Sequence, residues 1–207
     1  MKDGLWPVTL TARRVGGAPV VLRPMRGRDR RQWETLRAEN SEWLRPWEAT
    51  SPEPTATGMP FRQLVRHFDR EASEGRLQPF VIETEGRVVG QMHLFGIAWG
   101  SLRSASAGYW VAESFAGQGI VPFALAAACD HAFLVLGLHR VEVNIRPENT
   151  ASLRVVEKLG FQEEGLRRRY LHIDGLWRDH RSFALTVEDL GNKSMVELWN
   201  HSQEGVT

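Results

Sequence analysis

The sequence has little of several residue classes, and each shortage excludes a kind of protein. Its 207 residues include a single cysteine, Cys129, which excludes a disulfide framework and a cysteine-based zinc site and suits a reducing compartment. The longest weakly charged run, residues 120–138, contains Asp130 and His131, so it predicts a buried helix rather than a membrane span. Residues 1–10 carry no long apolar core. We therefore expect no signal peptide, no membrane partner and a cytoplasmic location.

Charge of either sign is not in excess. Lys and Arg number 26 and Asp and Glu number 25, for a net charge of +1, so no overall field directs the chain to nucleic acid or an anionic membrane. The 42% hydrophobic share is that of an ordinary globular protein. No internal repeat is present, and the most loop-like stretch, residues 49–60, is too short for a domain linker. We expect one domain over residues 1–207, with 49–60 as a functional loop.

Hydrophobic periodicity predicts strands and helices that alternate along the chain. The expected strands are 20–25, 79–85, 88–99, 103–112, 139–146, 162–173 and 177–187. The expected helices are 28–40, 61–74, 120–135, 149–159 and a short one at the C-terminal end. Glu85-Gly86 and Asp174-Gly175 are hairpin-turn signals. The order β-αα-βββ-α-β-α-ββ-α predicts an α/β fold, a mixed sheet flanked by helices.

The sharpest local motif is a strand, GYWVA, that runs through ESFAGQGI into a helix. Gly117 and Gly119 lack a Cβ and allow a close approach to the backbone. The helix N-terminus behind them favours an anion such as a pyrophosphate. The motif is neither a dinucleotide fingerprint, since Pro122 interrupts it, nor a P-loop. On these residues alone, a tight strand-to-helix turn explains it equally well.

A second motif, RPENTASLRVVEKLGF, begins about thirty residues after the first. The turn FAGQGI, the element NTASLRVVEKLGF and the element order resemble the GNAT superfamily of acetyl-CoA-dependent N-acetyltransferases, over about residues 20–190. The stretches YLHIDGLWRDH and AENSEWLRPWE resemble its Rim branch, and within it the ribosomal-protein-alanine acetyltransferases. The resemblance implies a central, mostly antiparallel sheet flanked by helices, acetyl-CoA as cosubstrate, no metal, and the N-terminal alanine α-amine of a ribosomal protein as acceptor.

The resemblance also assigns coenzyme contacts to individual residues. Backbone groups of the strand would hold the pantetheine arm, and N–H groups of the glycine turn would hold the pyrophosphate. Ser114 replaces the Arg or Gln that the family usually places three residues before the first glycine, so we expect Gln118 or a nearby arginine to compensate in part. The implied coenzyme-binding residues are Trp110, Val111, Gly117, Gln118, Gly119, Ile120, Asn149 and Ser152.

Asn149 has two compatible roles, as a helix cap and as a contact to the coenzyme arm. Many members of the superfamily carry the proton donor to the departing thiolate as a tyrosine seven residues after the asparagine, but that position is Val156 here. The resemblance to the Rim branch, which uses a serine three residues after the asparagine, instead implies this role for Ser152. A plain helix-surface role for Ser152 stays open. No cysteine lies in either motif, so we expect direct attack in a ternary complex. The backbone N–H near Val111 would stabilise the oxyanion.

The general base is left open between Glu48, Glu142, His180 and an ordered water. Trp47, Glu48, Tyr109 and Tyr170 are the expected acceptor-binding residues, and Glu48 would pair with a protonated N-terminus. One alternative acceptor is a small amine such as an antibiotic, a polyamine or an amino acid. A second alternative is a non-catalytic ribosome- or RNA-associated binding module. We expect a monomer or a homodimer.

Overall fold

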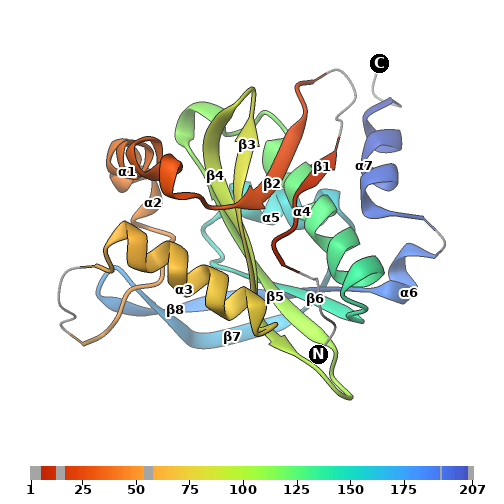
Figure 1. Ribbon diagram of the computed structural model, residues 1–207. Coiled ribbons are helices and arrows are strands. Elements are labelled where there is room, and N and C mark those ends of the chain that lie inside the picture. Colours follow the sequence, from red (N-terminus) through yellow and green to blue (C-terminus); the bar gives the residue numbers. More distant parts are fainter. Residues whose placement is uncertain (1–5, 13–16, 54–57, 192, 205–207) are drawn as a thin grey trace.

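One eight-stranded sheet organises the chain, in the order β1-β2-β3-β4-β5-β6-β8-β7 (Figure 1). The computed structural model describes residues 6–12, 17–53, 58–191 and 193–204. The strands are β1 (Leu10–Ala12), β2 (Val20–Pro24), β3 (Leu77–Thr84), β4 (Arg87–Ala98), β5 (Ser104–Val111), β6 (Arg140–Ile145), β7 (Gln162–Ile173) and β8 (Leu176–Thr186). The helices are α1 (Arg30–Glu39), α2 (Ser41–Leu44), α3 (Phe61–Ser73), α4 (Ile120–Asp130), α5 (Thr150–Lys158), α6 (Val187–Leu190) and α7 (Met195–Glu204).

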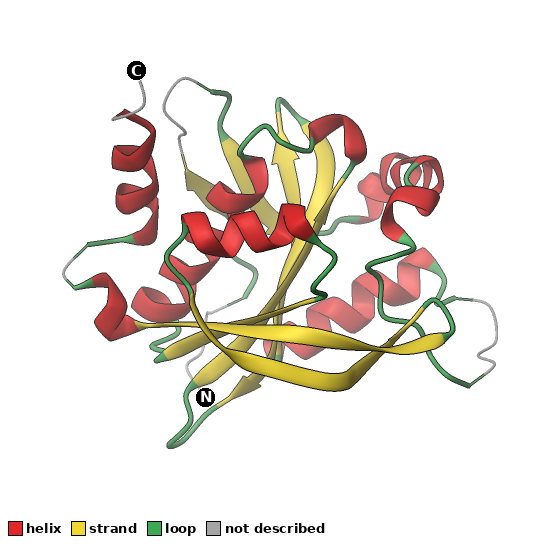
Figure 2. Cartoon of the chain, turned by 180° about the vertical axis from the view of Figure 1, so that it is seen from behind, coloured by secondary structure: helices red, strands yellow, loops and turns green. Residues whose placement is uncertain are grey.

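Different helices cover the two faces of the sheet. Successive side chains of a strand point to opposite faces, so Phe80 and Ile82 of β3 join the large core cluster with α4, α5 and α7. Val81, between them, packs in a smaller cluster against side chains of α1 and α3. The reverse view in Figure 2 shows the long β7–β8 hairpin extending across the sheet's far end. The sheet is thus a layer between two unequal helical layers.

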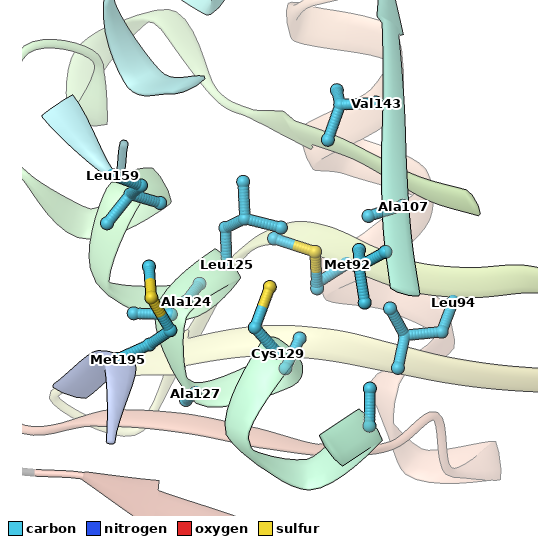
Figure 3. Packing of buried hydrophobic residues seen from close by; sticks show 14 of the residues in the cluster. Met92, Leu94, Ala107, Ala124, Leu125, Ala127, Cys129, Val143, Leu159 and Met195 are labelled. Carbon is cyan, nitrogen blue, oxygen red and sulfur yellow. The ribbon is translucent and has the colours of Figure 1, made fainter. Parts of the chain in front are cut away.

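The large core is packed around α4, whose sequence is rich in alanine. Figure 3 shows Cys129 on this helix among Leu125, Met92 and Ala124. Cys129 is fully buried, and burial raises the pKa of its thiol above the ordinary value. Cys129 is therefore a core residue and is not among the residues that line the cavity described below.

The sheet splits between β5 and β6. These two strands pair in parallel only over Ser104–Ser106 with Arg140–Glu142, whereas β5 pairs with β4 in antiparallel register along its whole length, to Val111. The remainder of β5 therefore has its β6-facing edge unpaired. This divergence creates a gap in the middle of the sheet, next to which the candidate site is described below.

The expected element order is confirmed, and so are the two hairpin turns. Glu85-Gly86 and Asp174-Gly175 each place both central residues at positive φ, the conformation that a two-residue hairpin turn requires. Strand β1 was not expected, because three residues that pair only with β2 carry too short a pattern to read. The expected helix 120–135 ends in a π-helical turn, His131–Val135. Within the described ranges, no helix is both long and apolar enough to cross a membrane.

His131, in that π-helical turn, predicts an acid sensitivity. The ring is 3% exposed and packs edge-on against Phe80, and burial lowers its pKa from 6.5 to about 4. Between those values the unfolded chain binds a proton that the folded chain does not, so the free energy of unfolding falls as the pH drops. From pH 7 to pH 5 we expect a loss of about 2 kcal/mol from this residue. Urea unfolding at both pH values should show a smaller loss for His131→Phe; an equal loss would contradict the assignment.

Candidate active site

A cavity of about 690 Å³ occupies the split between β5 and β6. It reaches both faces of the sheet: Gln91 and His93 line it from the α1–α3 side, and Asn149 and Ser152 line it from the α4–α5 side. β5 supplies the lining from Gly108 to Val111 between them. A substrate in this cavity can therefore be approached by protein groups from two opposite directions.

The glycine turn forms one end of this cavity. Gly117 and Gly119 have φ values of 74° and 73°, which side chains rarely adopt. They line the cavity together with Ile120, the first residue of the eleven-residue α4. Gln118 is not among the lining residues, and its amide donates to the Ser114 carbonyl oxygen at 2.8 Å.

Two cations on α5 also face this end of the cavity. Arg154 and Lys158 are four residues apart and both line it, because residues at that spacing share one helix face. The glycine turn, the helix N-terminus and these two charges fit a large anion. Arg154 is therefore a candidate for the arginine expected to compensate for Ser114.

The β5 backbone offers hydrogen-bonding groups to the cavity. The N–H of Ala112 donates to the Val89 carbonyl oxygen at 2.9 Å, toward β4. Because successive N–H groups of a strand point in opposite directions, the N–H of Val111 faces the split. The carbonyl oxygen of Val111 accepts a hydrogen bond from the Trp43 indole at 3.1 Å, and the N–H is the donor that Val111 presents to the split.

Asn149, Ser152 and Tyr109 meet on the α5 side. The Ser152 N–H donates to Oδ1 of Asn149 at 3.0 Å, so the predicted helix cap is confirmed. The hydroxyls of Ser152 and Tyr109 lie 2.7 Å apart. Burial raises the pKa of Tyr109 above its ordinary value, so the phenol keeps its proton at neutral pH. A tyrosine hydroxyl is therefore bonded to Ser152, and it comes from β5 rather than from position 156, where many family members carry a tyrosine.

Trp47 and Glu48, two of the expected acceptor-binding residues, also line the cavity. Both carboxylate oxygens of Glu48 accept hydrogen bonds from Arg37. The Arg37 guanidinium lies 5.2 Å from the Trp110 ring centre, and Arg146 lies 5.4 Å from that of Trp47. Both oxygens of the Glu48 carboxylate are therefore already engaged with Arg37 within the fold.

The segment 38–48, singled out in the sequence, attaches this end of the cavity to the end of β5. Oδ1 of Asn40 accepts a hydrogen bond from the N–H of Glu113 at 2.8 Å, and Trp43 bonds Val111 two residues earlier. Farther along, the carbonyl oxygen of Pro46 accepts a hydrogen bond from Arg146. These contacts explain the pattern of polar and aromatic residues in this segment, which local propensity does not.

Three candidate residues lie outside the cavity lining. Glu142 accepts hydrogen bonds from Arg140 and Arg167. Tyr170 packs edge-on against His180, with 5.6 Å between ring centres. Burial lowers the pKa of His180. The structure therefore does not bring these three to the residues around Ser152.

The expected loop 49–60 lies partly within the described structure. The N–H of Thr50 donates to the His172 carbonyl oxygen at 2.8 Å, which holds the loop against β7. Residues 54–57 lie outside the described residues.

Sequence reasoning missed Gln91 and His93, which line the cavity from β4. Trp110 donates to Oε1 of Gln91 at 3.0 Å, and Nε2 of Gln91 lies 3.4 Å from Nε2 of His93. Phe68 of α3 packs edge-on against the imidazole. Burial lowers the pKa of His93 to about 4. Polar residues at alternate positions of an otherwise apolar strand, as in QMH, are the signal that could have found them.

Comparison with known proteins agrees with this geometry. The model of the family described as "Acetyltransferase (GNAT) domain" matches residues 20–162. The chain belongs to the GNAT acetyltransferases. As a GNAT enzyme it is an N-acetyltransferase that uses acetyl-CoA, and the resemblance seen in the two motifs is confirmed.

Individual relatives place this GNAT enzyme near the Rim proteins. The structure titled "Mycobacterium smegmatis RimJ in complex with CoA-disulfide" superimposes with a TM-score of 0.89 at 41% identity, covering 96% of each chain. The "[Ribosomal protein uS5]-alanine N-acetyltransferase" of Escherichia coli (strain K12) is 31% identical, over 82% of this chain and 89% of that protein. Spermidine N(1)-acetyltransferase of the same strain is 28% identical, over 77% and 82%. The relatives of this chain thus include one named for a ribosomal-protein acceptor and one named for a polyamine acceptor.

Proposed function

We propose that this GNAT enzyme acetylates the N-terminal α-amine of a ribosomal protein, with alanine as the first residue. The observation that carries the proposal is the ion pairing of the carboxylates that line the cavity. Among the described cavity-lining residues the carboxylates are Glu48 and Glu148, and each is ion-paired, with Arg37 and with Arg146. A polyamine carries several positive charges and needs free carboxylates to bind, whereas a peptide N-terminus presents one amine. The names of the Rim relatives support the same acceptor.

The residues of this chain divide the chemistry between them. When bound, acetyl-CoA supplies an acetyl thioester that an amine can attack. The glycine turn, Arg154 and Lys158 would hold the phosphates of acetyl-CoA. The N–H of Val111 would stabilise the negative charge that develops on the acetyl carbonyl oxygen. Ser152 donates the proton that the leaving sulfur takes, and Tyr109 stabilises the Ser152 oxygen through its 2.7 Å hydrogen bond.

Acetyl-CoA should raise the melting temperature. A ligand that binds only the folded state, at a hundred times its Kd, adds about 2.7 kcal/mol, which for this length corresponds to a rise of roughly 5–11 °C. Scanning calorimetry with and without saturating acetyl-CoA checks this. The blank is the protein without acetyl-CoA, in buffer with salt added to equal ionic strength. An unchanged melting temperature would contradict the coenzyme site itself.

The acceptor is tested separately by thiol release. We expect turnover on peptides that begin with alanine and copy ribosomal-protein N-termini, and none on the same peptides with a blocked N-terminus. Spermidine and small amines serve as the competing panel. Activity confined to that panel would replace the ribosomal acceptor by a small amine. Salt-dependent RNA binding without any thiol release would support a binding module instead.

A further inference from the structure

We propose that His93 is the catalytic residue that accepts the proton of the attacking amine. The inference rests on the proposed acetyl transfer and deepens it, because the base was left open by the sequence. His93 of β4 lies directly across from Gly108 of β5, and Gln91 across from Trp110. Tyr109 lies between Gly108 and Trp110 on β5, so its side chain points to the opposite face of the sheet, where it bonds Ser152. His93 and Ser152 therefore flank the same gap from opposite sides of the sheet.

That placement matches the geometry of the reaction. The amine approaches the carbonyl carbon from one side while the sulfur departs from another, so the proton acceptor and the proton donor must be separate groups. Ser152 lies on the face of α4 and α5, with the glycine turn. His93 lies on the face of α1 and α3, with Trp47 and Glu48 at the acceptor end.

A hydrogen-bond chain determines which nitrogen of His93 carries its proton. The Trp110 indole can only donate, so the atom it meets at 3.0 Å is the carbonyl oxygen of Gln91. The Gln91 amide N–H₂ then faces Nε2 of His93, at 3.4 Å. Nε2 must accept, so the proton resides on Nδ1. The Gln91 contact is long, and an amine N–H can displace it.

The other titratable groups around the cavity are engaged elsewhere. Glu48 and Glu148 are held by arginines, and Tyr109 is protonated and bonded to Ser152. Arg154 and Lys158 are cations at the coenzyme end. Among the described lining residues, this leaves the His93 imidazole as a neutral base outside any ion pair. Since burial keeps its pKa near 4, the imidazole is unprotonated throughout the neutral range.

The proton movements balance. The lone pair of the neutral amine forms the C–N bond, and the C–S bond breaks with its electron pair remaining on sulfur. The nitrogen becomes strongly acidic as the C–N bond forms, so a weakly basic imidazole suffices to take its proton. Ser152 gives a proton to sulfur. The imidazolium then loses its proton to water, and the serine oxygen regains one from water.

The test combines two substitutions with one spectroscopic measurement. His93→Gln keeps a polar side chain of similar reach but cannot take a proton, and we expect kcat to fall about a hundredfold. His139→Gln is the matched control, because His139 is half-exposed, bonds Glu188 and lies outside the cavity lining; its kcat should be unchanged. His93→Ala leaves room for imidazole, and added imidazole should raise the kcat of this variant at least tenfold. Histidine ¹⁵N shifts of the wild-type protein should show Nδ1–H and a bare Nε2.

The outcomes separate this inference from the proposed function. Both His93 variants should keep the acetyl-CoA-induced rise in melting temperature, because the coenzyme end is untouched. A normal kcat in His93→Gln, a proton on Nε2, or a loss in His93→Ala that imidazole does not restore would overturn the role of His93 and leave the acetyl transfer intact. A wild-type protein that releases no thiol with any amine would overturn the proposed function itself.

Discussion

Replacing Ser152 by alanine is expected to lower kcat about a hundredfold with little change in the Kd for acetyl-CoA. In the proposed mechanism this hydroxyl protonates the leaving sulfur, and the Tyr109 hydroxyl lies 2.7 Å from it. The helix cap uses the backbone N–H of residue 152, bonded to Asn149, so removal of the side chain leaves α5 in place. Steady-state kinetics of thiol release measures the fall in kcat, and calorimetric titration with acetyl-CoA measures the Kd.

Ser101→Ala is the matched control for this substitution. Ser101 lies in an exposed turn before β5, and its loss should change neither parameter. Tyr109→Phe provides the intermediate case, because Ser152 keeps its own hydroxyl while its partner is lost. We expect a fall in kcat of about tenfold. A normal kcat in Ser152→Ala would remove Ser152 from the mechanism, and a large increase in Kd would make it a coenzyme-binding residue only.

Gly90→Ala is expected to lower the free energy of unfolding by about 3 kcal/mol. Gly90 of β4 lies opposite Val111, and a Cβ at this position would lie 2.2 Å from the Trp110 carbonyl oxygen and 3.0 Å from the Val111 Cα. Both are backbone atoms and cannot rotate aside. The strand that faces the coenzyme must move, so the acetyl-CoA-induced rise in melting temperature should shrink as well. Urea unfolding and melts with the ligand measure the two effects.

Gly27→Ala separates this clash from the general effect of losing a glycine. A Cβ on Gly27 meets no atom within 4 Å, and its φ is not positive, so the free energy of unfolding should stay within about 0.5 kcal/mol of wild type. Equal stability of Gly90→Ala and Gly27→Ala would show that β4 and β5 yield without strain. The close approach of the strands would then have no part in shaping the coenzyme site.

Local interactions explain why the turns, the helix cap and the order of elements could be predicted from the sequence. The hairpin turns need φ > 0 at adjacent residues, and Asp174-Gly175 supplies it within two positions. The cap at Asn149 bonds a backbone N–H three residues away. The glycine turn and the helix that follows it are contiguous. Each of these features depends on neighbours within about one helical turn, so sequence spacing carries the whole signal.

The polar partners of the site depend instead on how the strands come together. Tyr109 meets Ser152 across 43 residues, and Glu48, in the turn after α2, meets Arg37 of α1. Glu142, a candidate base by its position on β6, is turned to Arg140 and Arg167. The sequence by itself determined the element order, the strand–glycine turn–helix motif, the cap and the resemblance to the family. The tertiary structure alone decided which titratable groups reach the cavity, because strand register and the β5–β6 split set the face and the partner of each side chain.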